Sequence, residues 1–178
     1  MGSGETGGHG VSSWVETAMS IHPDMESLLL TREQIARRVA ELGRQISEDY
    51  RGRDLVLVGA LKGAIVFLSD LIRAISIPHR FDLIGASSYG SGTTSSGHVT
   101  ISHRIKLPVA GCDILVVEDI LDTGRTTAAL FRELEGCGAR DMALCVLLAK
   151  CKTRVVDIQP RYVGFEIPDR FVVGYGLD

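Results

Sequence analysis

The segment from Val116 to Thr127 (Val-Val-Glu-Asp-Ile-Leu-Asp-Thr-Gly-Arg-Thr-Thr) constrains the fold of this chain more than any other. Together with Ile114 and Leu115, its start forms an apolar run typical of a buried strand in a parallel sheet. Adjacent acids follow, then a Thr-Gly turn, and then a helix predicted over residues 126–134. In open α/β sheets, ligands bind beyond the carboxyl ends of the strands. The segment therefore predicts a binding site at such an end.

The turn and the helix start are suited to a phosphate group. Thr123, Gly124, Thr126 and Thr127 place backbone N–H groups and hydroxyls at a helix N-terminus. Unpaired donors and the helix dipole both favour an anion there. Arg125 adds a positive charge, although its side chain could also point outward. These five residues predict a phosphate cradle.

Three carboxylates, Glu118, Asp119 and Asp122, lie beside this cradle and would by themselves repel a phosphate. They are explained if they hold sugar hydroxyls, a Mg²⁺ ion or a proton in transit. A ligand with a monophosphate, a ribose and a metal-bound pyrophosphate meets all three needs. The alternative, a strand end with solvated acids and an ordinary helix cap, explains each residue singly but not the whole arrangement.

Strands and helices alternate along the rest of the chain. A capping-box signal at Thr31 and Gln34 opens the first predicted helix. Helices are predicted at residues 31–50, 64–75 and 126–134, and strands at residues 54–58 (closed by Gly59), 80–87, 99–105, 114–117, 142–148, 162–165 and 171–173. This alternation predicts an α/β fold with a doubly wound, mostly parallel sheet. Residues 88–97 have no apolar anchor beyond Tyr89 and are expected to be mobile.

The composition narrows the function classes. At 178 residues, the chain suits a Gly-rich flexible leader over residues 1–20 and a single domain over residues 21–178. A net charge of −3 offers no global attraction for nucleic acid or a membrane. The four cysteines form no Cys-X-X-Cys pair, so a zinc site is not expected. Reduced, partly buried thiols at Cys112 and Cys145 are typical of a cytoplasmic protein.

The segment from Val116 to Thr127 resembles the motif of type I phosphoribosyltransferases that binds 5-phosphoribosyl pyrophosphate (PRPP). Further stretches resemble the hypoxanthine–guanine branch of that family, and the resemblance covers about residues 28–178. These stretches are Gly59-Ala-Leu-Lys-Gly63, Ser87-Ser-Tyr-Gly90, Leu147-Leu-Ala-Lys150 with Arg154, Val163-Gly-Phe-Glu-Ile-Pro168 and Phe171-Val-Val-Gly-Tyr-Gly-Leu-Asp178. The resemblance implies a sheet flanked by helices, with a small hood and a mobile lid loop.

The resemblance also implies roles around the ribose and the base. Asp122 matches the general base near N7 of the purine, and Glu118 and Asp119 match residues that hold the ribose hydroxyls directly or through metal. The stretch from Thr123 to Thr127 matches the site of the 5′-phosphate. Lys150 matches a donor to the purine O6, which selects oxopurines because an ammonium cannot accept a hydrogen bond from a 6-amino group.

Other implied roles lie in four further stretches. Lys62 and Gly63 match the pyrophosphate loop, often with a non-proline cis peptide before the lysine, and a solvated lysine is the alternative. Phe171 matches a residue that stacks on the base, and Val172 matches a residue whose backbone carbonyl binds the edge of the base. The alternative is that both residues simply belong to the hydrophobic core. The remaining matches are Ser88 and Tyr89 at the start of the lid, Arg154 near the pyrophosphate, and Asp178, which contacts a second Mg²⁺ through water. The family continues past Asp178 with an arginine that reaches the pyrophosphate, so either the sequence is truncated or that contribution is missing.

The implied activity is Mg²⁺-dependent transfer of the phosphoribosyl group from PRPP to hypoxanthine or guanine, in a homodimer or homotetramer. Three alternatives remain: xanthine as the preferred base, a PRPP-sensing regulator that binds nucleic acid, and a catalytically inactive relative. The net charge and the lack of a Lys/Arg cluster argue against the regulator.

Overall fold

The computed structural model describes residues 27–88, 99–151 and 155–177. The chain divides into two compact units, Met1–Thr31 and Arg32–Asp178. The described part of the first unit, residues 27–31, contains no helix or strand. All the elements below belong to the second unit.

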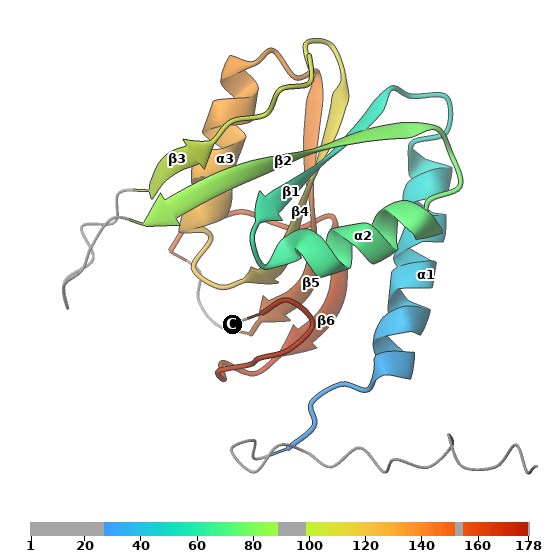
Figure 1. Ribbon diagram of the computed structural model, residues 1–178, viewed down its shortest axis with the longest axis vertical. Helices are drawn as coiled ribbons and strands as arrows, with labels where there is room; N and C mark the ends of the chain where they lie inside the picture. The colour runs from blue at the N-terminus through green and yellow to red at the C-terminus, as the bar shows by residue number, and fades with distance from the viewer. Residues whose placement is uncertain (1–26, 89–98, 152–154, 178) are drawn as a thin grey trace, which may run out of the picture. The chain divides into compact units, whose positions relative to one another are not determined.

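The second unit is built around a six-stranded sheet with strand order β3-β2-β1-β4-β5-β6. The strands are β1 (Leu55–Leu61), β2 (His79–Ser88), β3 (Val99–His103), β4 (Asp113–Leu121), β5 (Asp141–Lys150) and β6 (Tyr162–Ile167), and the helices are α1 (Arg32–Asp49), α2 (Ala64–Ala74) and α3 (Arg125–Gly136). Only the β2–β3 pair among these is antiparallel. The arrowheads of β1, β4, β5 and β6 therefore point to the same edge (Figure 1). The predicted mostly parallel α/β sheet is confirmed.

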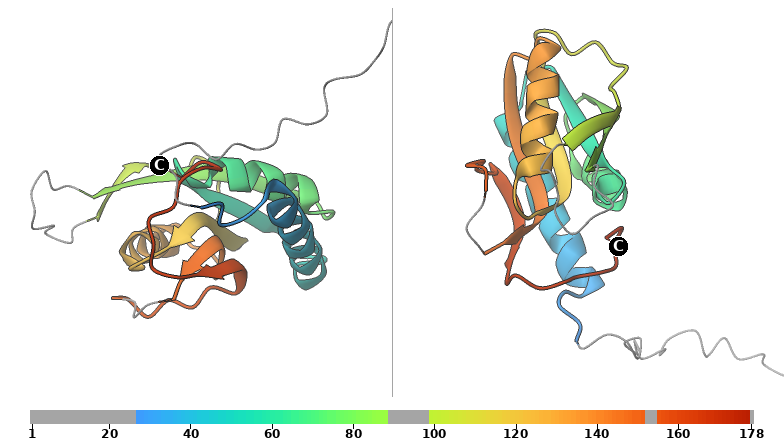
Figure 2. Two further views of the ribbon diagram at one scale, coloured as in Figure 1. Left: turned by 90° about the horizontal axis from the view of Figure 1, so that it is seen from below. Right: turned by 90° about the vertical axis from the view of Figure 1, so that its left-hand side faces the viewer.

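The connections create a switch point between β1 and β4. From β1 the chain crosses through α2 to β2, whereas from β4 it crosses through α3 to β5 on the other side. Right-handed crossovers that run in opposite directions place their helices on opposite faces of the sheet, as α2 and α3 are in Figure 2. Ligands bind where the strand order reverses in this way. The fold thus points to the ends of β1 and β4.

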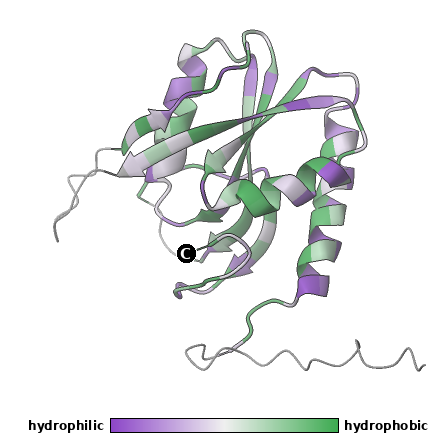
Figure 3. Ribbon diagram, viewed as in Figure 1, coloured by the Kyte–Doolittle hydropathy of each residue, from purple (hydrophilic) through white to green (hydrophobic). Residues whose placement is uncertain are grey.

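The inner strands form the core because both of their faces are covered. Side chains alternate between the faces of a strand. The even-numbered Val56, Ile114 and Val116 are fully buried in one apolar cluster with Leu130 and Leu134 of α3. The apolar colouring in Figure 3 runs along these strands and on one side of α1. Burial on both faces explains the continuous apolar runs in the sequence.

The predicted element bounds needed three corrections. Gly59 does not close β1, which continues to Leu61. A Cβ at position 59 would lie 2.6 Å from Leu68 Cδ2, so this glycine makes room for α2. β4 extends beyond residue 117 through both acids to Leu121. The predicted strand at residues 171–173 was wrong, because this stretch precedes an isolated bridge between Gly174 and Leu177. The remaining bounds agree with the predictions to within two residues.

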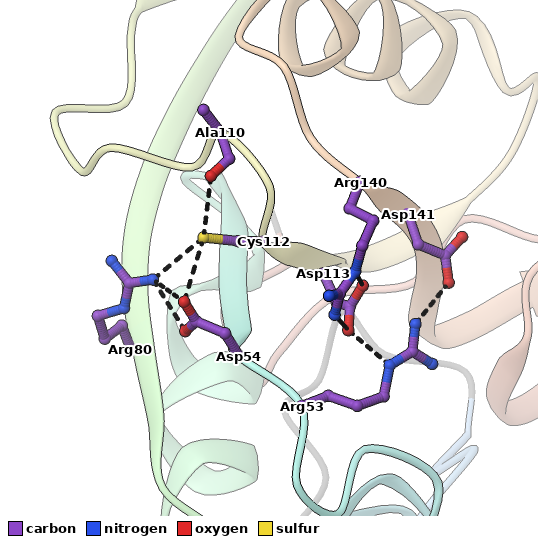
Figure 4. Close-up of polar contacts among 8 residues, drawn as sticks. All are labelled: Arg53, Asp54, Arg80, Ala110, Cys112, Asp113, Arg140 and Asp141. Carbon is purple, nitrogen blue, oxygen red and sulfur yellow. Dashed lines mark hydrogen bonds and ion pairs between the residues drawn. The ribbon is translucent and has the colours of Figure 1, made fainter.

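A polar cluster lies at the amino ends of the parallel strands (Figure 4). Asp113, fully buried at the start of β4, accepts hydrogen bonds from Arg53 Nε at 2.5 Å and from Arg140 Nε at 2.8 Å. Beside it, Arg80 donates to Asp54 and to the buried thiol of Cys112. The cluster is at the sheet edge opposite the switch-point ends, so it serves the fold and not the site.

The predicted lid at residues 88–97 begins at the end of β2, and its residues 89–97 are outside the described part of the chain. Among the described helices, none combines the length and the apolarity needed to cross a bilayer.

Candidate active site

The phosphate cradle forms at the turn from β4 into α3. Gly124 adopts φ = 80°, a left-handed conformation that favours glycine, and its carbonyl accepts the N–H of Ala128 as the helix begins. The backbone N–H groups of Val155 and Val156 both donate to the Thr123 carbonyl. These hydrogen bonds from the segment after β5 fix the turn. The N-terminus of α3 is directed to the carboxyl end of the sheet.

Glu118 is buried at this end of β4, and only 4% of it is exposed. Burial raises the pKa of its carboxyl to about 7, although a 2.6 Å hydrogen bond from the Thr127 hydroxyl acts in the opposite direction. Thr127 is itself 1% exposed. The structure thus places the Thr127 hydroxyl against Glu118, whereas Thr126 is exposed on the first turn of the helix. Sequence reasoning placed both hydroxyls in the cradle and missed this contact.

Asp119 and Gly63 meet across the switch point. A Cβ at position 63 would lie only 1.8 Å from Asp119 Oδ2, so the missing side chain lets the loop after β1 approach the carboxylate. The peptide bond between Leu61 and Lys62 is cis, as the resemblance implied, and Lys62 is exposed. The loop of residues 174–177 also packs here, because a Cβ on Gly176 would lie 2.6 Å from the Gly63 carbonyl oxygen.

Lys150 brings two carboxylates together at the end of β5. Its Nζ lies 3.4 Å from Asp122 Oδ2 and 3.0 Å from Asp169 Oδ1. The lysine side chain is 13% exposed, whereas both carboxylates are roughly half exposed. Asp169 was missed from the sequence, since no pattern marks it beyond its position directly after Pro168.

Phe171 is 84% exposed, which overturns the alternative that it belongs to the core. Val172 is partly exposed. Phe171 follows two residues after Asp169, which contacts Lys150. An aromatic ring left in solvent offers a face on which a planar ligand can stack. The side chain of Ser88 and all of Tyr89, Arg154 and Asp178 are outside the described residues.

The carboxylates also suit a magnesium ion. Within the described residues, no three acidic, His or Cys side chains are grouped closely enough to hold a cation by themselves. Mg²⁺ is commonly bound by one or two carboxylates together with substrate phosphates and water. Asp119 beside Gly63 and Glu118 beside Thr127 each offer one carboxylate of this kind. A cation would favour the ionised form of the buried Glu118. The residues present therefore fit a magnesium ion that arrives with a phosphorylated ligand.

Comparisons with known proteins agree with this geometry. Residues 27–178 match the family described as the phosphoribosyl transferase domain. The hypoxanthine-guanine phosphoribosyltransferase of Mycobacterium tuberculosis is 46% identical over 169 residues, which cover 92% of this chain and 84% of that protein. The hypoxanthine phosphoribosyltransferase of Salmonella typhimurium is 44% identical over 154 residues, or 85% of this chain and 86% of that protein.

A solved structure gives the same result for the fold. The crystal structure of a hypoxanthine phosphoribosyltransferase from Staphylococcus aureus superposes with a TM-score of 0.85 at 42% identity, covering 92% of this chain and 89% of that one. With its switch-point cradle and its lysine between carboxylates, the chain belongs to the type I phosphoribosyltransferases, in the hypoxanthine–guanine branch.

Proposed function

We propose that this chain transfers the 5-phosphoribosyl group of PRPP to hypoxanthine or guanine, with Mg²⁺, giving IMP or GMP and pyrophosphate. The observation that carries the proposal is the 3.4 Å separation between Lys150 Nζ and Asp122 Oδ2. A 6-oxopurine has O6 and N7 side by side on one edge. A donor to O6 and an acceptor for the N7 proton must therefore be neighbours, as these two side chains are.

In the proposed reaction Asp122 accepts the proton from N7 while N9 forms its bond to the anomeric carbon of the ribose. The bond from that carbon to the pyrophosphate oxygen breaks, with inversion. The 5′-phosphate is anchored by Thr123, Gly124, Arg125 and Thr126 at the start of α3, where the backbone donors and the helix dipole favour an anion. Thr127 contributes its backbone at that turn, since its hydroxyl contacts Glu118.

Magnesium, when bound, would neutralise charge on the pyrophosphate as it departs. Glu118 and Asp119 would hold the ribose hydroxyls or the metal, and Asp178 would contact a second ion through water. Lys62 and Gly63 would bind the pyrophosphate through the loop after β1, with Arg154 close to it. Ser88 and Tyr89 would begin a lid that excludes water from the reaction.

Lys150 would select the base. Its ammonium donates hydrogen bonds but accepts none, so a 6-amino group in place of O6 would leave donors facing one another. An unmatched buried polar pair costs about 1–3 kcal/mol, which corresponds to a preference of roughly fivefold to 150-fold for oxopurines over adenine. Phe171 would stack on the base and the Val172 carbonyl would bind its edge.

We further propose that the chain works in the cytoplasm as a homodimer or homotetramer, without nucleic acid or membrane partners. The buried free thiols of Cys112 and Cys145 support the cytoplasm, and the net charge of −3 supports the lack of nucleic acid and membrane partners. Residues 21–178 are proposed as one domain after a leader at residues 1–20. The compact unit Arg32–Asp178 supports a single domain, although it begins later than residue 21, and the leader lies outside the described residues.

The test is a spectrophotometric assay of the purified protein with PRPP, Mg²⁺ and each of hypoxanthine, guanine, xanthine and adenine. Turnover of hypoxanthine or guanine but not adenine is expected. Asp122→Asn should lower kcat by roughly 10²–10⁴-fold, the usual contribution of a general base. Preference for xanthine would change the proposed substrate. Binding of PRPP without turnover of any base would contradict the proposed activity.

A further inference from the structure

Asp169 lies where the sheet register brings it to the purine-binding lysine. The β5–β6 ladder ends with Lys150 opposite Ile167, so Asp169 follows only two residues beyond the partner of Lys150. Its Oδ1 lies 3.0 Å from Lys150 Nζ. The carboxyl ends of the neighbouring strands β4, β5 and β6 thereby supply Asp122, Lys150 and Asp169 to one cluster.

The backbone around Asp169 is held at both ends. The Cys151 N–H donates to the Ile167 carbonyl at 2.8 Å, and the Arg170 N–H donates to the Pro168 carbonyl at 2.8 Å. Pro168 also restricts its own φ. A carboxylate on such a turn has a defined position, unlike one on a long exposed side chain. The same turn leads directly to Phe171.

The two carboxylates compete for one ammonium. Asp169 Oδ1 is the nearer partner at 3.0 Å, against 3.4 Å for Asp122 Oδ2. A lysine has three N–H donors, so it can donate to Asp169 and to a purine O6 together. Asp122, by contrast, has to present the same Oδ2 side to the N7 proton, and the ammonium occupies that side while it stays within 3.4 Å. A second carboxylate allows the lysine to leave Asp122 without becoming an unpaired charge in a largely buried place.

We propose that Asp169 is a positioning residue, which holds the Lys150 ammonium at the place of the purine O6 and draws it away from Asp122. The inference rests on the proposed function, because it assigns the O6 contact to Lys150. Asp169 acts through Lys150, whose ammonium lies 3.0 Å from its Oδ1. Loss of the Asp169 carboxylate should therefore weaken binding of the base and leave binding of the sugar phosphate unchanged.

The decisive variant is Asp169→Asn, which keeps the shape of the side chain and removes its charge. We expect KM for hypoxanthine to rise about tenfold, as for loss of a charge-assisted hydrogen bond, while KM for PRPP changes by less than about twofold. Asp169→Glu, which restores the carboxylate, should recover part of the loss. A purely structural role would instead alter both KM values together.

Asp141→Asn is the matched control. Asp141 begins the same strand that Lys150 ends, its side chain is 49% exposed against 50% for Asp169, and it pairs with Arg53 at 3.2 Å. Removal of this carboxylate should leave both KM values unchanged. An equal rise in KM for hypoxanthine in the two variants would overturn the role of Asp169.

Calorimetric titration with IMP and with ribose 5-phosphate separates this inference from the activity. Asp169→Asn should weaken IMP binding about tenfold and leave ribose 5-phosphate binding unchanged, because only IMP carries the O6 group. A wild-type protein that binds IMP but turns over no base would contradict the proposed function alone, and the two titrations would still decide the role of Asp169. Unchanged IMP binding in Asp169→Asn, or no IMP binding by the wild type, would overturn the inference.

Discussion

At position 63, a single methyl group would collide with the carboxylate of Asp119. The added Cβ would lie 1.8 Å from Oδ2 and 2.6 Å from Cγ, whereas Gly63 itself has φ = −57° and ψ = −36°, which suit any residue. An alanine would thus leave the backbone unstrained and displace only the carboxylate. The effect of the substitution should appear in binding and catalysis more than in folding.

We predict that Gly63→Ala lowers kcat/KM for PRPP by roughly 10²-fold, the typical cost of misplacing a site by about 1 Å. Gly136→Ala is the control, because a Cβ there meets nothing within 4 Å. Steady-state kinetics on both variants would check this. Unchanged kinetics in Gly63→Ala would mean that Asp119 can move without consequence.

At the scale of elements, the hydrogen bond from Thr127 to Glu118 joins α3 to β4 inside the protein. It is 2.6 Å long and both side chains are buried. Burial raises the pKa of Glu118 to about 7, so the folded protein favours the protonated acid. The stability that this group contributes is therefore fully present at low pH and is lost as pH rises through 7. The Thr127 hydroxyl limits that loss, because it stabilises the ionised form.

We predict that Thr127→Val, which removes the hydroxyl and keeps the branched shape, destabilises the fold by about 1–3 kcal/mol at pH 8. The destabilisation should be smaller at pH 5, where Glu118 is protonated with or without the hydroxyl. Urea unfolding at both values would measure it, and Thr127→Ser should behave like the wild type. Equal destabilisation at pH 5 and pH 8 would contradict the assigned role.

At the scale of the whole molecule, the charged cluster that stabilises the fold and the candidate active site lie at opposite ends of the parallel strands. The hydrogen bond from Arg140, assisted by that from Arg53, holds the pKa of the buried Asp113 below its ordinary value despite burial. A depressed pKa contributes stability above the unfolded value of about 4, and that stability is lost as pH falls below it. The cluster in Figure 4 should therefore matter for folding at neutral pH and hardly for turnover.

We predict that Asp113→Asn lowers the free energy of unfolding by roughly 2–3 kcal/mol at pH 7, since hydrogen bonds to charged groups are lost at a buried position. The difference from the wild type should shrink at pH 3, and KM for PRPP should stay unchanged. Asp54→Asn, which removes a carboxylate that is 60% exposed on the same edge, should destabilise the fold less than Asp113→Asn does, because solvent screens an exposed ion pair. A large change in KM in Asp113→Asn would show that the two ends of the sheet are coupled.

Most of the helices and strands, and part of the candidate site, could be predicted from the sequence, because the residues that determine them are close together in the chain. Apolar runs such as residues 114–117 can only be buried, and the order of strands and helices then leads to a parallel sheet. The acids, the Thr-Gly turn and the helix start are contiguous from Glu118 to Thr127, so their joint place at a strand end follows from the chain itself. For residues far from this segment, including Lys150 and Phe171, the expected roles came from the family resemblance.

Only the tertiary structure decided which distant side chains meet. Asp169 reaches Lys150 through the β5–β6 register, and the room at Gly63 exists because the loop after β1 passes beside Asp119. Gly59 and the stretch from Phe171 to Val173 were misread for the same reason. In the sequence, a glycine that makes room for Leu68 looks the same as a glycine that ends a strand. An aromatic residue left in solvent likewise looks the same as one in a core strand, and only the neighbours in space distinguish them. Local pattern determines the elements, whereas register and packing determine the contacts between residues far apart in the chain.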